Sequence, residues 1–257
     1  MTSIPDNGFF SPQWPVLYED NHLLGLYKPA GLLVQGDATG DPSLLDLGKA
    51  WLKARYAKPG NVFLGLVHRL DRPVAGVVLF ARTSKAAARL SAQFRERRVG
   101  KDYLAVVHGR LSEAAGELCH HLVRAGSSSR VVDAPTDGAQ EARLSFRRVG
   151  TAHDRSLVSV SLHTGRRHQI RVQIAALGHP ILGDLRYGAP APLPNGQIAL
   201  LAHRLSVMHP TRKTPITLES PPPRGWPWPA SEDARPTVPW AWQEMEMSMG
   251  SSPGITV

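Results

Sequence analysis

A single acidic residue, Asp71, lies between two short apolar runs and has an arginine on either side. The runs Val62 to Val67 and Val77 to Phe80 are rich in β-branched and aromatic residues, which predicts two buried strands. Arg69 and Arg72 flank the acid. The pattern therefore places one carboxylate on a tight turn at a strand end, where it either caps the turn or forms part of a site.

A second segment, residues 163–173, supplies several basic groups. It contains a turn at Gly165, followed by Arg166, Arg167 and His168. This pattern predicts a short basic helix that ends near Gly178, because glycine is a common residue at helix C-termini. Together the two segments hold one acid and several bases, which suits an ionised carboxylate that works beside a polyanion.

Four segments, taken in order, resemble the motifs of the RluA-type family of RNA pseudouridine synthases. They are residues 27–31 (YKPAG), 68–72 (HRLDR), 101–105 (KDYLA) and 164–172 (TGRRHQIRV), the last continuing into 178–184 (GHPILGD). The resemblance implies an α+β fold, with a mixed and mostly antiparallel sheet, flanking helices and a central basic cleft. By contrast, residues 203–205 repeat the tripeptide HRL without a following acid, and predict an ordinary strand over Leu200 to Met208.

The resemblance implies an isomerase that converts specific uridines of ribosomal or transfer RNA to pseudouridine. In that reaction the bond from ribose C1′ to base N1 breaks and C5 is joined to C1′ instead, so no cofactor and no metal are expected. Asp71 is implied to be the essential carboxylate. The resemblance leaves three routes open for Asp71: attack on C1′, addition to the pyrimidine ring, and formation of a glycal intermediate. A noncatalytic RNA-binding or RNA-chaperone protein on the same fold is the alternative.

The resemblance also assigns roles to other residues. Arg171 is implied to be the basic partner of Asp71, and its replacement by alanine is expected to reduce turnover much more than stability. Tyr103 matches the active-site tyrosine. Stacking on the base is its expected first role, because a phenol with a pKa near 10 is a poor base at neutral pH, and proton transfer at C5 is its second role when it is suitably hydrogen-bonded. Arg69 is associated with the flipped-out nucleotide. The remaining candidates for binding substrate or shaping the cleft are His68, Arg72, Arg166, His168, Gln169 and Lys28.

Charge and composition agree with an RNA partner. Lys and Arg number 30 against 21 Asp and Glu, a formal net charge of +9, and a basic protein favours polyanions. No secretory signal and no membrane-spanning run is found in the sequence. The only cysteine, Cys119, excludes an intramolecular disulfide, so a cytoplasmic location is expected. A monomer is expected as well.

Three regions are predicted. Residues 1–14 form an N-terminal extension, residues 15–223 a single catalytic domain, and residues 224–257 a Pro-rich, flexible tail that tryptophans could dock on the body. Many relatives carry an S4-like RNA-binding domain before the core, and here a stand-alone catalytic domain is expected. Helices are predicted over 44–56, with Ser43 as N-cap, and over 84–97. The other predicted strands cover 16–27 (as a pair), 102–108, 117–123, 142–149 and 158–163.

Overall fold

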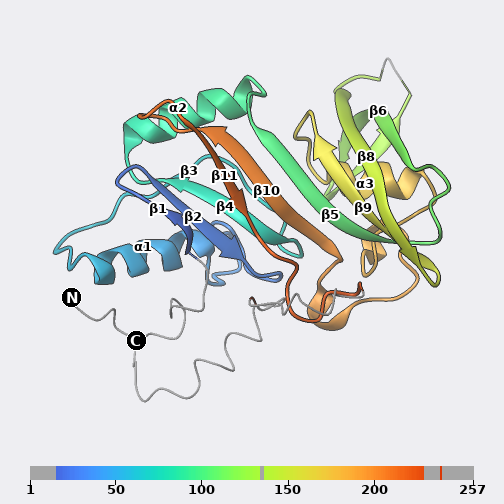
Figure 1. Ribbon diagram of the computed structural model, residues 1–257, viewed down its shortest axis with the longest axis horizontal. Helices are drawn as coiled ribbons and strands as arrows, with labels where there is room; N and C mark the ends of the chain where they lie inside the picture. The colour runs from blue at the N-terminus through green and yellow to red at the C-terminus, as the bar shows by residue number, and fades with distance from the viewer. Residues whose placement is uncertain (1–15, 134–135, 229–237, 239–257) are drawn as a thin grey trace.

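A single mixed sheet dominates the computed structural model, which describes residues 16–133, 136–228 and 238 (Figure 1). Within these residues the sheet has eleven strands, and the α+β class predicted from the sequence is confirmed. The strands are β1 Val16–Glu19, β2 Leu23–Lys28, β3 Gly65–Leu66, β4 Ala75–Ala81, β5 Gly100–His108, β6 Ala115–Ala125, β7 Ser128–Val132, β8 Gln140–Ala152, β9 Arg155–Leu162, β10 Leu200–Met208 and β11 Pro215–Glu219. The helices are α1 Leu44–Arg55, α2 Ser84–Arg95 and α3 Gln169–Ala176, with the short 3-10 turns η1 Leu185–Tyr187 and η2 Pro194–Gly196.

The strand order is β1-β2-β4-β10-β5-β9-β8-β6-β7, with β11 paired to β10 and β3 paired to β4. All pairs are antiparallel except β4 and β10, which run parallel. Strand β10 therefore joins an N-terminal half of the sheet, β1 to β4, to a second half, β5 to β9. Figure 1 shows α1 and α2 beside the first half and α3 beside the second.

The first half of the sheet is covered by two capped helices. Helix α1 begins where the Ser43 hydroxyl accepts the backbone N–H of Asp46, and it buries Trp51 and Leu52 against β2 and β4. Helix α2 begins in the same way at Thr83. All seven residues of β4 are buried, as expected for a central strand covered on both faces.

Gly76, near the start of β4, permits the close approach of β10. Its φ of +126° lies in the region that side chains rarely adopt, and a Cβ there would lie 2.2 Å from the carbonyl oxygen of Ala202. Glycine is therefore required where the two parallel strands meet, five residues after Asp71.

The structure changes two of the predicted elements. The strand predicted over Val62 to Val67 shrinks to the two residues of β3, because only Gly65 and Leu66 pair with β4 and Phe63 is half exposed. The basic residues 166–168 lie in the turn before α3 rather than in the helix, because His168 has a left-handed φ of 54°. The strand predicted over Leu200 to Met208 is confirmed as β10, and the two long helices end within two residues of their predicted limits.

The beginning of the predicted tail lies against the sheet. Trp226 and Trp228 pack on the hydrophobic cluster around β5, β8 and β9. Val238 is buried beside Tyr27 and Leu201. The predicted N-terminal extension, Trp240 and Trp242 lie outside the described residues.

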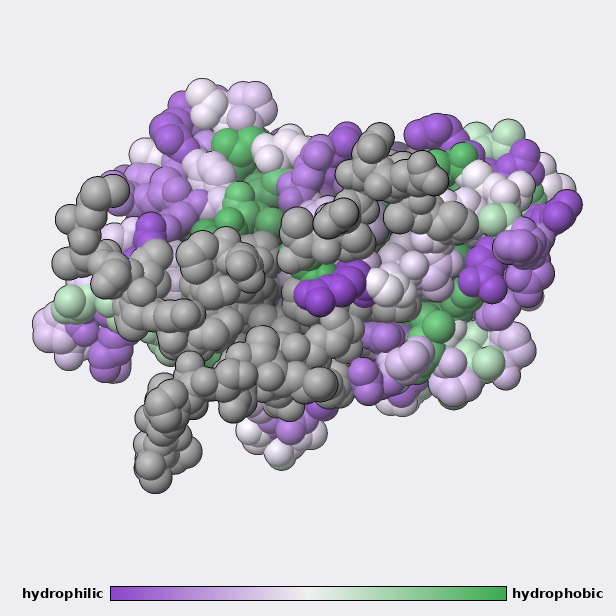
Figure 2. All heavy atoms as spheres, turned by 60° about the horizontal axis from the view of Figure 1, so that its bottom comes forward, coloured by the Kyte–Doolittle hydropathy of each residue, from purple (hydrophilic) through white to green (hydrophobic). Residues whose placement is uncertain are grey.

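The visible surface is mostly polar. Where described residues are exposed in Figure 2, hydrophilic side chains cover most of the area and apolar ones form small separate patches. None of the described helices is long and apolar enough to cross a membrane.

Candidate active site

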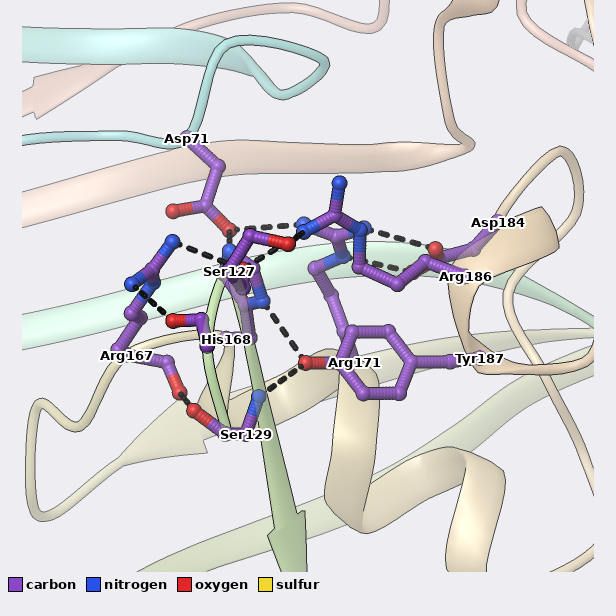
Figure 3. Close-up of polar contacts among 10 residues, drawn as sticks. Asp71, Ser127, Ser129, Arg167, His168, Arg171, Asp184, Arg186 and Tyr187 are labelled. Carbon is purple, nitrogen blue, oxygen red and sulfur yellow. Dashed lines mark hydrogen bonds and ion pairs between the residues drawn. The ribbon is translucent and has the colours of Figure 1, made fainter. Parts of the chain in front are cut away.

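Asp71 lies in the loop between β3 and β4, facing α3. The loop is closed by a hydrogen bond from the Val74 N–H to the Asp71 carbonyl oxygen, 3.0 Å long. The carboxylate is partly accessible, with 31% of the side chain exposed. Arg171 reaches it from α3, with Nη1 3.2 Å from Oδ2 (Figure 3). The structure therefore brings together the acid and the base of the two motifs, which are 100 residues apart in sequence.

Arg171 holds a second acid at the same time. Its Nε and Nη2 donate to the two carboxylate oxygens of Asp184 at 2.7 and 2.8 Å, in the bidentate geometry that guanidinium groups favour. Both side chains are buried, with 6% and 1% exposed. Although burial opposes it, the hydrogen bonds and charges of Asp184 and Asp71 raise the pKa of Arg171. The guanidinium is thus a fixed positive charge beside Asp71.

His168 approaches the same oxygen of Asp71 from a second side. Its Nε2 lies 3.6 Å from Oδ2, and its Nδ1 lies 2.8 Å from the hydroxyl of Tyr187. Burial lowers the pKa of His168 to about 4; Asp71 opposes this shift, and Arg171 favours it. The imidazole is therefore neutral at pH 7.

The two oxygens of Asp71 have different surroundings. Arg171 and His168 both point at Oδ2, as Figure 3 shows. No group among the described residues forms a hydrogen bond with Oδ1. One oxygen of the carboxylate is thus held, while the other has no hydrogen-bond partner in the part of the chain that the structure describes.

Tyr103 lies in the middle of the sheet, on β5, paired with Val160 and Ala202. Burial raises the pKa of its phenol, and the negative charge of Asp71 raises it further. The hydroxyl therefore keeps its proton at neutral pH. This suits the expected stacking role, or donation of a hydrogen bond, and disfavours action as a base.

Lys28 supports the loop that carries Asp71. The side chain is fully buried at the end of β2, and its Nζ donates to the carbonyl oxygens of residues 29, 32 and 72 at 2.9, 2.8 and 3.1 Å. Three acceptors use all three protons of an ammonium group. Lys28 therefore ties the residue that follows Asp71 to β2, which agrees with its expected part in shaping the cleft.

Two candidates from the HRLDR segment have side-chain partners elsewhere in the fold. The His68 Nε2 accepts the N–H of Leu79 at 2.9 Å, and its ring stacks on Phe94 at 4.9 Å between centroids. The exposed Arg72 donates to the carbonyl oxygen of Gly31 and forms an ion pair with Asp41. These contacts stabilise the fold around the loop. Substrate binding by His68 and Arg72 stays a prediction.

The other candidates differ in exposure. Arg69 is exposed, and no hydrogen bond or ion pair from the described residues reaches its side chain. Gln169 is buried, and its Oε1 accepts from the Thr164 hydroxyl and from the Arg166 N–H. The Arg166 side chain donates to the carbonyl oxygen of Glu141. Arg69 is thus the candidate most available to a ligand, and Gln169 shapes the turn before α3.

Comparisons with known proteins agree with this geometry. Residues 22–176, more than half of the chain, match the family described as RNA pseudouridylate synthase. The chain belongs to this family. It is 34% identical over 222 residues to ribosomal large subunit pseudouridine synthase D of Xylella fastidiosa, covering 81% of this chain and 66% of that protein. It is 35% identical over 212 residues to ribosomal large subunit pseudouridine synthase C of Vibrio vulnificus, covering 80% of this chain and 65% of that protein.

Solved structures of the same pseudouridylate synthase family share the fold. Human RNA pseudouridylate synthase domain containing 4 superposes with a TM-score of 0.69 at 25% identity, covering 81% of this chain and 88% of that chain. Human RNA pseudouridylate synthase domain containing 1 superposes with a TM-score of 0.64 at 23% identity, covering 95% of this chain and 97% of that chain. Against the two bacterial proteins, the chain spans slightly less than two thirds of their length.

Sequence reasoning missed two residues of this synthase-family site, Asp184 and Tyr187. Asp184 ends the last of the recognised segments, so its position was visible but its contact with Arg171 was not. Tyr187 follows three residues later, in η1, and carries no periodic or motif signal. Their roles depend on contacts with Arg171 and His168, which only the folded chain reveals.

Proposed function

We propose that this protein is an RNA pseudouridine synthase, acting on uridine in ribosomal or transfer RNA, with Asp71 as the essential carboxylate. One observation carries the proposal: Asp71 is partly accessible and is held through Oδ2 by Arg171, while no described residue forms a hydrogen bond with its Oδ1. The ribosomal RNA substrates are suggested by the names of the two bacterial relatives. Asp71, Tyr103 and Arg171 all come from one chain, so we propose that a monomer is sufficient.

The reaction needs an ionised carboxylate at the nucleotide. The C1′–N1 bond breaks and the base turns. C5 then forms the new bond to C1′ and loses its proton, while N1 gains one, so the product is an isomer of the substrate. Asp71 could attack C1′, add to the pyrimidine ring, or remove a proton from the sugar. Each of these routes uses an unprotonated carboxylate oxygen. In our proposal that oxygen is Oδ1, since Oδ2 is engaged with Arg171.

The RNA must present the uridine outside its base stack, which costs a few kcal/mol in paired RNA and less in loops. We propose that Arg69, exposed two residues before Asp71, fills or braces the space that the base leaves. Tyr103 would stack on the base, and Arg166 would contact phosphate. The basic net charge supports this assignment.

The deciding experiment expresses the protein in a host without its own homologues and maps pseudouridine across all stable RNAs. Wild type is compared with Asp71→Asn, which keeps the side-chain shape and removes the charge. A matched control is Asp154→Asn, because that side chain is 77% exposed in the β8–β9 turn. We expect new marks with wild type and Asp154→Asn, and none with Asp71→Asn.

Two results would contradict the proposal. If folded Asp71→Asn leaves the same marks as wild type, the carboxylate is not essential. If wild type binds RNA tightly but adds no mark to any RNA, the noncatalytic RNA-binding alternative is correct. The position of a new mark also identifies the RNA and the uridine.

A further inference from the structure

A chain of polar contacts links the backbone of β7 to the carboxylate of Asp71. The Ser129 N–H donates to the Tyr187 hydroxyl oxygen at 2.9 Å, and that oxygen lies 2.8 Å from Nδ1 of His168. The Nε2 on the other side of the ring lies 3.6 Å from Oδ2 of Asp71 (Figure 3). Neither Tyr187 nor this chain of contacts is needed to account for the activity proposed above.

The position of one hydrogen follows from the Tyr187 hydroxyl. A phenol oxygen can accept hydrogen bonds and has one hydrogen to donate. The Ser129 N–H already donates to it, and Nδ1 of His168 is the acceptor within reach among the described residues. If Nδ1 carried the proton instead, the phenol would receive two N–H groups, and its own hydrogen would have no acceptor within the described part of the chain. The phenol therefore donates, and Nδ1 is unprotonated.

The carboxylate supports the same arrangement from the other end of the ring. A neutral imidazole carries one proton, so an unprotonated Nδ1 means that Nε2 bears the hydrogen. An N–H at Nε2 faces Oδ2 of Asp71 with favourable charge, whereas a lone pair there would repel the anion. At 3.6 Å the contact is electrostatic rather than a formed hydrogen bond, and such contacts often shorten when substrate binds.

Burial and nearby positive charges keep the imidazole of His168 neutral at pH 7. Burial is the largest cause of its low pKa of about 4, and the charges of Arg171, Arg167 and Arg186 act in the same direction. Asp71 is the opposing charge. His168 thus adds a directed donor beside Asp71 without adding a second full positive charge to the one on Arg171.

We propose that Tyr187 is a positioning residue that fixes the Nε2–H tautomer of His168, so that His168 and Arg171 together orient Asp71 with Oδ1 free. The catalytic consequence rests on the proposed function, but the tautomer itself does not. An orienting group that selects the imidazole tautomer is a known way to make a neighbouring reactive group effective.

Tyr187→Phe tests the proposal with little disturbance. The Arg171 guanidinium lies over the Tyr187 ring at 5.1 Å, a contact that phenylalanine keeps, so the variant removes only the hydroxyl. The matched control is Tyr56→Phe, at the end of α1, whose hydroxyl likewise takes part in two hydrogen bonds, donating to Glu19 and accepting from Arg82. His168→Gln provides a second comparison, because its side-chain amide supplies an N–H that does not depend on a tautomer.

The direct measurement is ¹⁵N NMR of the full-length protein labelled at histidine, recorded at pH 7. The signals of His168 are assigned by their absence in His168→Gln. We expect protonated Nε2 and unprotonated Nδ1 in wild type and Tyr56→Phe, and a tautomer mixture in Tyr187→Phe. A wild-type ring protonated at Nδ1, or an unchanged ring in Tyr187→Phe, overturns the proposal.

The kinetic measurement uses the RNA identified by mapping. We expect kcat to fall about three- to tenfold in Tyr187→Phe, which is the size of one lost hydrogen bond, with KM changed by less than about twofold. Activity in His168→Gln should not fall further when Tyr187→Phe is added. Full kcat in Tyr187→Phe overturns the catalytic half of the proposal. If wild type itself makes no pseudouridine, the proposed function fails, and the NMR result still decides the tautomer.

Discussion

At the scale of residues, the site is defined by one arginine between two acids of different exposure. Asp71 is partly accessible, whereas Asp184 is almost completely buried, and Arg171 binds both. The accessible acid suits chemistry and the buried acid suits orientation. Because the guanidinium is anchored at Asp184 by two hydrogen bonds, its third nitrogen has a defined direction toward Asp71.

This arrangement changes the effect expected of Arg171→Ala. The sequence predicts loss of turnover with little loss of stability. In the structure the variant leaves the carboxylate of Asp184 buried without a partner, so we expect the free energy of unfolding to fall by about 3–5 kcal/mol as well. Urea unfolding followed by circular dichroism measures this fall, and a loss below about 1 kcal/mol would contradict it.

A double variant separates the two effects. Arg171→Met combined with Asp184→Asn removes both buried charges, so it should recover at least half of the lost stability. It should remain inactive, because nothing then holds Oδ2 of Asp71 from the side of α3. Recovery of pseudouridine formation in the double variant would show that Arg171 acts only on folding.

At the scale of elements, the loop from β3 to β4 is positioned by backbone contacts at its end. The Gly31 N–H and the Lys28 ammonium both donate to the Arg72 carbonyl oxygen, directly after Asp71. The loop also buries Val74 and packs Leu70 against the core. Its geometry thus combines apolar packing with polar anchors at the end of β2 and just after it.

Lys28→Met tests this anchoring. Methionine has a similar length but donates no hydrogen bond, so three carbonyl oxygens lose a donor in a buried place. We expect the free energy of unfolding to fall by roughly 3 kcal/mol or more, and kcat to fall in the protein that remains folded. Lys53→Met, at an exposed position of α1, is the control and should change stability by less than about 0.5 kcal/mol. Equal effects of the two substitutions would contradict the role.

The elements also show how far sequence reasoning reaches. Local patterns predicted the two long helices and β10, because capping residues and alternating apolar positions act within a few residues. They failed at Val62 to Val67 and at residues 166–168, where the backbone is set by distant contacts. Family motifs identified Asp71, Tyr103 and Arg171 as candidates. They gave no role to Tyr187, whose partners Ser129 and His168 are far from it in sequence.

At the scale of the whole molecule, a partly buried neutral histidine couples stability to pH. Burial lowers the pKa of His68 to about 4, with a smaller effect from the charge of Lys101. In the unfolded chain its pKa is near 6.5. Between pH 4 and 6.5 the unfolded state therefore binds more protons than the folded state, so this residue makes the free energy of unfolding rise with pH across that window.

His68→Gln removes this dependence. The glutamine side-chain oxygen can still accept the Leu79 N–H that the imidazole accepts in wild type. We expect the slope of unfolding free energy against pH between 4.5 and 6.5 to decrease by up to about 1.4 kcal/mol per pH unit. Above pH 7 the two curves should run parallel, which provides the internal control. Identical slopes in urea unfolding from pH 4.5 to 6.5 would contradict the assignment.

Strand order has a consequence for biosynthesis. Strand β10 lies between β4 and β5, yet among the described strands only its neighbour β11 is made after it. A nascent chain emerging from the ribosome can pair its early and middle strands locally, but the two groups have no shared partner until residues 200–208 arrive. Until then the segments bearing Asp71 and Arg171 remain on separately pairing halves, so the strand that joins these halves into one sheet follows both segments in synthesis.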